Sequence, residues 1–186
     1  QNALHADKGG IMVANVFDVN NKVTIITGGS RGLGRAMSMA FAKAGAKVVI
    51  ASRKQAACDQ LAAEIRAAGG DALAVACHVG EWGGLEALVQ AAKEHYGRID
   101  ILINNAGITR DNLLMRMSED DFDKVIETNL KSVFNIVKAC QRVFLKKRSG
   151  SIINISSIVG VKGNAHFGEL YCRLSLIHIS EPTRPE

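Results

Sequence analysis

Residues 23–34 read VTIITGGSRGLG, a short β-branched run followed at once by a glycine-rich turn. The run predicts a buried strand over Val23–Thr27, and a helical pattern over Gly34–Ala44 begins directly after the turn. Glycines between a strand and a helix allow a tight turn and let backbone N–H groups approach a phosphate at the positive end of the helix. A lone glycine turn is weak evidence, because many strand–helix loops carry glycine. Here the elements on both sides favour a phosphate-binding turn.

The alternation of strand and helix continues along the chain. Further strands are predicted at Lys47–Ala51, Ala72–Cys77, Ile99–Asn104 and Ser151–Ile155. Further helices are predicted at Lys54–Ala68, at Leu85–Tyr96, and from a capping box of Ser118 and Asp121 to about Lys147. Such alternation with short connections predicts parallel strands with helices on both faces. We therefore expect an α/β fold, a three-layer doubly wound parallel sheet of the Rossmann type that is incomplete after its fifth strand.

Length and composition narrow the class of protein. A chain of 186 residues suffices for one domain with a core. No apolar run reaches the roughly 20 residues that span a bilayer, and no signal-peptide pattern begins the chain. The net charge of +5 is scattered rather than clustered, which argues against nucleic-acid binding. The cysteines are widely spaced without a CxxC pair, so neither a zinc site nor a disulfide framework is indicated. We expect a cytoplasmic protein with no metal, membrane or nucleic-acid partner.

Both ends carry patterns that do not resemble natural protein sequence. Leu174–Arg184 (LSLIHISEPTR) matches, residue for residue, the translation of a common transposase sequencing adapter. A divergent tail is the alternative, which so long a match disfavours. Lys8–Met12 resembles the translation of a bacterial ribosome-binding site and start codon, with a flexible leader as the alternative. We expect residues 1–11 to be a translated leader, 12–173 a truncated dinucleotide-binding domain, and 174–186 an adapter-derived tail.

The spacing T-G-x-x-x-G-x-G over Thr27–Gly34 resembles the short-chain dehydrogenase/reductase family. The NNAG element at Asn104–Gly107, Asn129 in the long helix and Ser157 after the fifth strand are also similar to motifs of that family. The resemblance covers roughly residues 16–164 and implies a nicotinamide dinucleotide at the turn. The residues it implies for cofactor binding are Gly28, Ser30, Arg31, Gly32, Leu33, Gly34, Ser52, Arg53, His78, Val79, Asn105, Ala106 and Gly107.

The end of the second strand bears on which dinucleotide is bound. A site specific for NAD usually has a carboxylate there, which bonds the ribose 2′-OH. This chain has Ser52 and Arg53 and no acid. Arg53 and Arg31 suit bidentate recognition of a 2′-phosphate, although either alone could be a solvated surface residue. We therefore predict NADP(H). His78-Val79 departs from the Asp-Val or Asn-Val common in the family near the adenine, so His78 is either a contact to the adenine edge or simply structural.

Within the family, Ile108–Met117 (ITRDNLLMRM) closely resembles bacterial 3-oxoacyl-[acyl-carrier-protein] reductases. That resemblance implies reduction of a 3-oxoacyl thioester on acyl-carrier protein by NADPH, in fatty-acid synthesis, and a homotetramer at full length. The alternative is that this stretch is only a hydrophobic packing segment. The resemblance assigns catalytic roles to Asn129, Ser157 and Tyr171. Because Ser175 occupies the place of the family's lysine, Tyr171 is either the catalytic base or a chance match, and we expect the chain as written to be inactive.

Two other functions stay open. One is a different short-chain carbonyl reductase or alcohol dehydrogenase, because the segment CHVGEW at residues 77–82 is less typical of the fatty-acid enzyme. A join of two related genes at NNAG would have the same effect. The other is a non-catalytic NADP-binding module, which predicts binding of NADPH without turnover.

Overall fold

The computed structural model describes residues 17–110 and 116–157. The strands are β1 (Val23–Thr27), β2 (Lys47–Ser52), β3 (Asp71–Ala76), β4 (Ile101–Asn104) and β5 (Ser151–Asn154). The helical elements are α1 (Gly32–Lys43), α2 (Gln55–Ala67), α3 (Trp82–Tyr96), α4 (Glu119–Ile126), the π-helical turn η2 (Glu127–Lys131) and α5 (Ser132–Lys147). Strands and helices therefore alternate as predicted.

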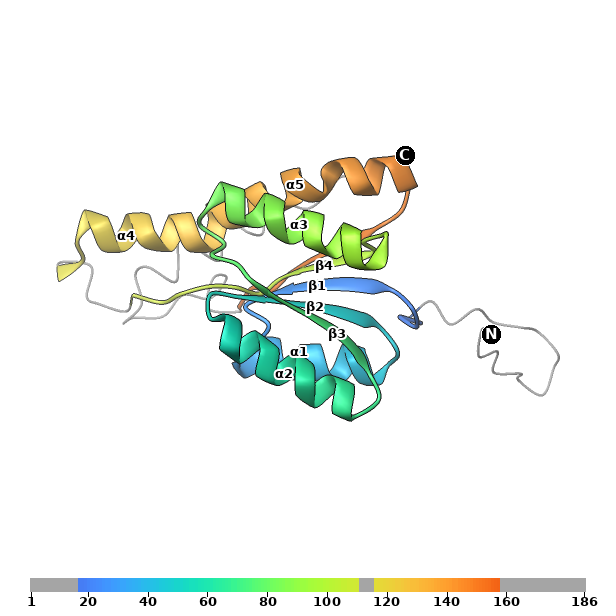
Figure 1. The fold of residues 1–186 in the computed structure, drawn as a ribbon. Coiled ribbons are helices and arrows are strands. Elements are labelled where there is room, and N and C mark those ends of the chain that lie inside the picture. The colour runs from blue at the N-terminus through green and yellow to red at the C-terminus, as the bar shows by residue number, and fades with distance from the viewer. Residues whose placement is uncertain (1–16, 111–115, 158–186) are drawn as a thin grey trace, which may run out of the picture.

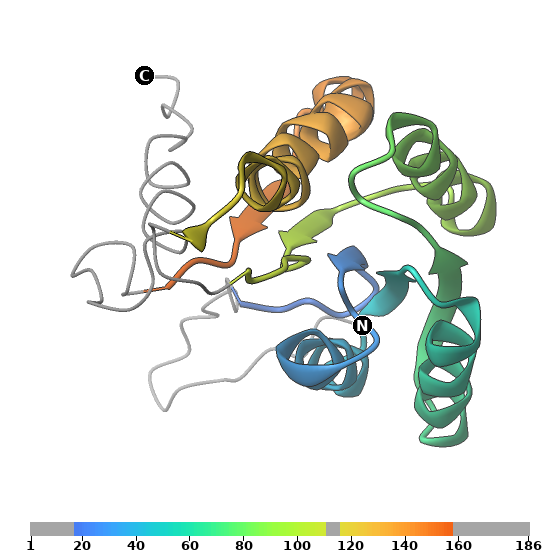
Figure 2. The same cartoon turned by 90° about the vertical axis from the view of Figure 1, so that its left-hand side faces the viewer.

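The strands form one parallel sheet in the order β3-β2-β1-β4-β5. Helices α1 and α2 cover one face, and α3 and α5 cover the other (Figures 1 and 2). The predicted three-layer, doubly wound α/β fold is confirmed. The chain moves outward from β1 through β2 to β3, then returns to the other side of β1 with β4. This reversal opens a crevice at the carboxyl ends of β1 and β4, where such sheets bind ligands.

Two apolar cores lie on the two faces of the sheet, because successive side chains of a strand point to opposite faces. Ile25 and Leu102 belong to the core under α3 and α5. Ile26 and Ile103 belong to the core under α1 and α2. Every residue of β1 is buried. A central strand covered on both faces needs such a continuous apolar run rather than an alternating one.

The long helix predicted from Ser118 to about Lys147 is interrupted. The structure ends α4 at Ile126, inserts the π-helical turn η2, and resumes an α-helix at Ser132. The predicted long helix is therefore present between the expected ends, and only the π-helical turn within it was not predicted. A π-helical turn takes one residue more than an α-helical turn, and such turns occur frequently at functional sites. None of the helices in the described ranges combines the length and apolar character that crossing a bilayer requires.

Asp100 connects several elements at the amino-terminal ends of the strands. Its side chain is 5% exposed, and its Oδ2 accepts a hydrogen bond of 2.9 Å from the backbone N–H of Val23, the first residue of β1. Its Oδ1 pairs with Arg98 at 2.7 Å and also with the ammonium of Lys147 at the end of α5. The backbone carbonyl of Asp100 accepts from Ser151, which starts β5. One buried carboxylate thus connects β1, β4 and α5.

Candidate functional site

A cavity of about 1050 Å³ lies at the carboxyl ends of the strands. All the residues predicted to bind the cofactor line it: Gly28, Ser30, Arg31, Gly32, Leu33, Gly34, Ser52, Arg53, His78, Val79, Asn105, Ala106 and Gly107. Residues that the sequence reasoning did not assign to the cofactor line it too: Lys54, Ala57, Cys77, Ile108, Arg110, Lys124, Glu127 and Thr128. The structure therefore gathers the predicted set in one place. Their binding of a cofactor stays a prediction.

The turn after β1 requires glycine at two positions. Gly28 adopts a positive φ of +64°, which side chains other than hydrogen disfavour. A Cβ on Gly34 would lie 2.1 Å from the carbonyl oxygen of Gly28. That distance is far inside van der Waals contact, and the obstructing atom belongs to the backbone. The turn therefore folds back on the start of α1 more closely than any side chain would allow.

The amino-terminal end of α1 leaves backbone N–H groups available to an anion. Arg31 occupies the N-cap position, and its side chain makes no capping hydrogen bond. The first turn of α1 contains no acidic residue. The first N–H groups of a helix have no partner within the helix and carry a partial positive charge. Since this end of α1 lines the cavity, a bound phosphate group fits the donors that the protein leaves unpaired.

A hydrogen-bonded bracket holds this turn against the segment after β4. The hydroxyl of buried Thr27 accepts from the backbone N–H groups of Asn105 at 3.0 Å and Ala106 at 3.1 Å. The Asn105 side-chain amide donates to the carbonyls of Thr27 at 2.9 Å and Gly28 at 3.3 Å. The NNAG element thus fixes the position of the glycine turn. Sequence reasoning quoted Thr27 in the motif but did not assign it this role.

Basic side chains dominate one end of the cavity. Arg31, Arg53 and Lys54 all line it, and all three are exposed. Within the part of the chain that the structure describes, none of the three is paired with a carboxylate. No acid stands at the end of β2, as the sequence indicated. Arg53 and Lys54, which follow β2, and Arg31, which follows β1, are three unneutralised cations in one cavity, and they favour a ligand that carries additional phosphate.

The predicted catalytic residues lie outside that cluster. Asn129 is 3% exposed, sits in η2, and clamps the backbone of Ile108. Its Oδ1 accepts from the Ile108 N–H at 2.8 Å, and its Nδ2 donates to the Ile108 carbonyl at 2.9 Å. Ser157 is half-buried and follows β5. Neither Asn129 nor Ser157 is among the described residues that line the cavity. Tyr171 lies outside the described residues.

Cys77, a buried residue, also lines the cavity. Burial raises its pKa to about 11, with help from the negative charge of Glu81. A thiol with so high a pKa stays protonated at neutral pH and is a poor nucleophile. Residues 17–110 and 116–157 contain no group of three side chains suited to holding a metal ion.

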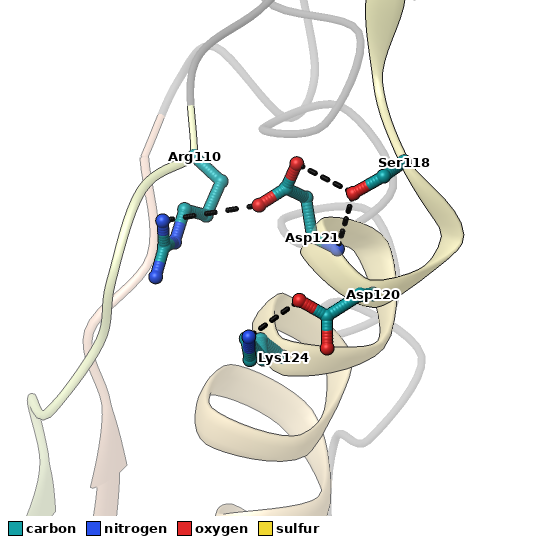
Figure 3. Close-up of polar contacts among 5 residues, drawn as sticks. All are labelled: Arg110, Ser118, Asp120, Asp121 and Lys124. Atoms are coloured by element: carbon teal, nitrogen blue, oxygen red, sulfur yellow. Dashed lines mark hydrogen bonds and ion pairs between the residues drawn. The ribbon is translucent and has the colours of Figure 1, made fainter.

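A charged cluster borders the cavity at the start of α4 (Figure 3). The Ser118 hydroxyl accepts from the Asp121 N–H at 3.1 Å and donates to the Asp121 carboxylate at 2.7 Å, which confirms the predicted cap. Arg110, which follows β4, lies 3.8 Å from the same carboxylate. Lys124 pairs with Asp120. The two cations that line this side of the cavity are therefore each matched by an acid, unlike the three unneutralised cations that follow β1 and β2.

Replacement of Asp121 by asparagine is expected to remove the dependence of the α4 cap on pH. The Ser118 hydrogen bond, followed by the charge of Arg110, lowers the pKa of the Asp121 carboxyl. A lowered pKa contributes stability that is complete above the unfolded value of about 3.9 and is lost as the pH falls below it. The D121N variant should therefore unfold at lower urea than wild type at pH 7, and the difference should shrink at pH 3.

The control is D123N, which changes an exposed acid of the same helix that is not part of the cluster. Its difference from wild type should be smaller at pH 7. A D121N difference that stayed constant between pH 7 and pH 3 would contradict the role given to the ionised carboxylate.

Comparison with known proteins agrees with this arrangement. A family model described as short chain dehydrogenase matches residues 22–172. The 3-oxoacyl-[acyl-carrier-protein] reductase of Synechocystis sp. is 44% identical over 144 residues, which are 77% of this chain and 58% of that protein. The FabG reductase of the same name from Staphylococcus aureus is 43% identical over 145 residues, 77% of this chain and 58% of that protein. The corresponding FabG from Vibrio cholerae is 41% identical over 149 residues, 80% of this chain and 60% of that protein.

The chain thus spans about three fifths of the length of these curated relatives. The matched family model covers both the glycine turn and the NNAG bracket that border the cavity. The resemblance on which the sequence analysis relied is confirmed, and the chain belongs to the short chain dehydrogenase family.

Proposed function

We propose that the protein binds NADP(H) in the cavity at the strand ends and reduces 3-oxoacyl thioesters carried on acyl-carrier protein. The product is the 3-hydroxyacyl form, made in the cytoplasm for fatty-acid synthesis, and the full-length assembly is a homotetramer. The names of the relatives support the substrate. The single observation that carries the choice of cofactor is the group of unpaired cations, Arg31, Arg53 and Lys54, where an NAD site would have a carboxylate.

We assign the different phosphate groups of the cofactor to different residues at the ends of the strands. The pyrophosphate is assigned to the uncapped end of α1, and the 2′-phosphate to Arg31, Arg53 and Lys54. The backbone N–H of Gly29 donates to the carbonyl of Ala51 at 3.1 Å, which ties the glycine turn to the end of β2. Backbone fixed in this way needs little reorganisation when the ligand arrives, which favours affinity.

The reaction needs a hydride donor, a proton donor and dipoles that stabilise the developing alkoxide. The nicotinamide supplies the hydride when it is bound. Asn129 orients the backbone at Ile108, on the rim of the cavity. Ser157 is assigned to the substrate oxygen and Tyr171 to proton donation. These assignments follow the family resemblance, residue by residue.

Replacement of Arg53 by alanine is expected to weaken NADPH binding about tenfold and to leave NADH binding within about twofold. Loss of a charge-assisted hydrogen bond typically costs about 1.5–3 kcal/mol, and exposure of Arg53 places the effect at the low end of that range. The measurement is a fluorescence titration of the reduced nicotinamide with each dinucleotide. The R142A variant removes an exposed arginine of α5 that does not line the cavity, and it should bind both cofactors as wild type does.

A turnover assay on the full-length protein separates the proposed reductase from a non-catalytic binding module. Oxidation of NADPH is followed at its near-ultraviolet absorbance with a 3-oxoacyl-acyl-carrier-protein substrate, and then with a simple ketone. Turnover that is faster with the carrier-bound thioester supports the proposal. Tight NADPH binding without turnover of either substrate would instead identify a binding module, and preference for the ketone would identify a different carbonyl reductase.

A further inference from the structure

We propose that His78 recognises the adenine ring as a hydrogen-bond donor, so that the site reads ring acceptor atoms and not the 6-amino group. This inference rests on the proposed dinucleotide-binding function. It concerns a residue that lies at the end of β3, beyond the 2′-phosphate cluster, and that the reductase mechanism does not use. It makes the side chain at this position a hydrogen-bond donor to the adenine, whereas a carboxylate at the same position would be an acceptor.

The order of the strand ends places the base beside His78. The pyrophosphate site lies at the turn after β1, and the ribose site lies at the end of β2. The next strand in that direction is β3, which is followed at once by Cys77, His78 and Val79. All three of these residues line the same cavity. An adenosine that extends from the pyrophosphate through the ribose therefore reaches the end of β3.

The backbone around His78 is fixed at both sides. The N–H of Cys77 donates to the carbonyl of Ser52 at 2.9 Å, which ties the end of β3 to the end of β2. The carbonyl of His78 accepts from the N–H of Glu81 at 3.0 Å, just before α3 begins. Cys77 and Val79 on either side of His78 are both buried and belong to the core under α3 and α5, which further fixes the backbone there. His78 itself is exposed and lines the cavity.

A local hydrogen bond decides which atom of the imidazole is available. The N–H of Gly80 donates to Nδ1 of His78 at 3.2 Å. A neutral imidazole that accepts at Nδ1 carries its proton on Nε2, and a protonated imidazole carries one there as well. Nε2 is therefore a donor in both charge states. A Cβ on Gly80 would lie 3.1 Å from Cε1 and 3.2 Å from Nδ1, so the glycine lets its amide approach the ring closely.

A donor beside the base complements only part of the adenine edge. The ring nitrogens accept hydrogen bonds, whereas the 6-amino group is itself a donor. We therefore place the N–H of His78 on N7, an acceptor beside position 6 that remains an acceptor when the 6-amino group becomes an oxo group; this N–H cannot bond the 6-amino group. An aspartate in its place would accept from the amino group and repel an oxygen at the same position. The two side chains thus predict opposite responses when the 6-amino group becomes an oxo group.

The test compares NADPH with its hypoxanthine analogue, in which a 6-oxo group replaces the 6-amino group and N1 carries a hydrogen. Dissociation constants for both are measured by nicotinamide fluorescence on the same protein. Wild type should bind the analogue as tightly as NADPH, within about threefold, or more tightly. The H78D variant should shift the ratio of the two constants by about tenfold toward NADPH, the size expected for one exchanged hydrogen bond. Because the ratio is taken on one protein, changes in net charge or in folded fraction cancel.

The matched control is H95D, which makes the same exchange on an exposed histidine in the last turn of α3, away from the cavity. Its ratio should equal that of wild type. Wild-type discrimination of more than threefold against the analogue, or an H78D ratio within threefold of wild type, would overturn the inference. Repeating the comparison with NADH and its hypoxanthine analogue separates the two proposals. A failure of the preference for NADPH would contradict the proposed cofactor and leave the ratio measurable with the other pair.

Discussion

The G34A variant is expected to lose NADPH binding by about tenfold or more and to unfold at lower urea than wild type. The added methyl group would meet the carbonyl oxygen of Gly28 at 2.1 Å and the Asn105 side-chain nitrogen at 2.7 Å. Relief requires the backbone of the turn to move, because Gly28 has no side chain that could give way. Overpacking of this kind costs about 1–3 kcal/mol. Movement of the turn also displaces the N–H groups at the start of α1 from the phosphate position, so both stability and affinity fall.

The measurements are a urea unfolding curve and a fluorescence titration with NADPH. The control is G83A, since a Cβ on Gly83 meets nothing within 4 Å and this residue lies in the first turn of α3. Alanine there should leave stability unchanged or raise it by up to about 1 kcal/mol, and affinity should not change. If G34A bound NADPH as wild type does, the glycine turn would not be the pyrophosphate site.

The D100A variant should lose about 3–5 kcal/mol in free energy of unfolding, the range observed when one partner of a buried ion pair is removed. Three groups lose their acceptor at once: the Val23 N–H, the Arg98 guanidinium and the Lys147 ammonium. The D100N variant keeps an oxygen for the Val23 N–H but offers the cations no charge, so its loss should be smaller. Folded D100N should still bind NADPH normally, because Asp100 lies at the edge of the sheet opposite the cavity.

The comparison variant is D120A, which removes an exposed carboxylate whose partner, Lys124, lies one helical turn away. Exposed pairs of this kind contribute about 0.5 kcal/mol or less, so its urea midpoint should stay close to that of wild type. A D100A loss no larger than the D120A loss would show that the carboxylate does not hold the amino-terminal edge of the sheet together.

The sheet could be predicted from sequence because its strands are buried on both faces. A run such as Val23–Thr27 has no polar residue but threonine, and the structure places the strand at those residues. The residues that the family resemblance assigns to the cofactor lie together because parallel strands deliver their following residues to one end of the sheet, and their binding of a cofactor stays a prediction. The capping of α4 by Ser118 follows from local chemistry alone, and the structure contains it.

Other features depend on information that no local pattern carries. The turn η2 leaves Val125 and Ile136 buried on either side, so apolar spacing alone gave no signal of the extra residue. Glu127 and Thr128, the first two residues of that turn, line the cavity, and no spacing in the sequence marks them. Lys54 lines the cavity too, although no motif distinguishes it from other surface lysines. The anchoring role of Asp100 depends on three elements far apart in sequence.

The clamp of Asn129 on Ile108 has a further meaning for the sheet. A neighbouring strand would pair with an N–H and a carbonyl along β4, and the Asn129 amide offers one acceptor and one donor to the N–H and carbonyl of Ile108. The Asn129 side chain therefore pairs with Ile108 as a residue of a neighbouring strand would. Ile108 lies four residues beyond the last residue of β4. An isosteric aspartate has no donor and would set an oxygen against the Ile108 carbonyl. The Asn129 amide thus makes the same pair of hydrogen bonds that one peptide group makes with another, and these bonds fix the loop that follows the sheet.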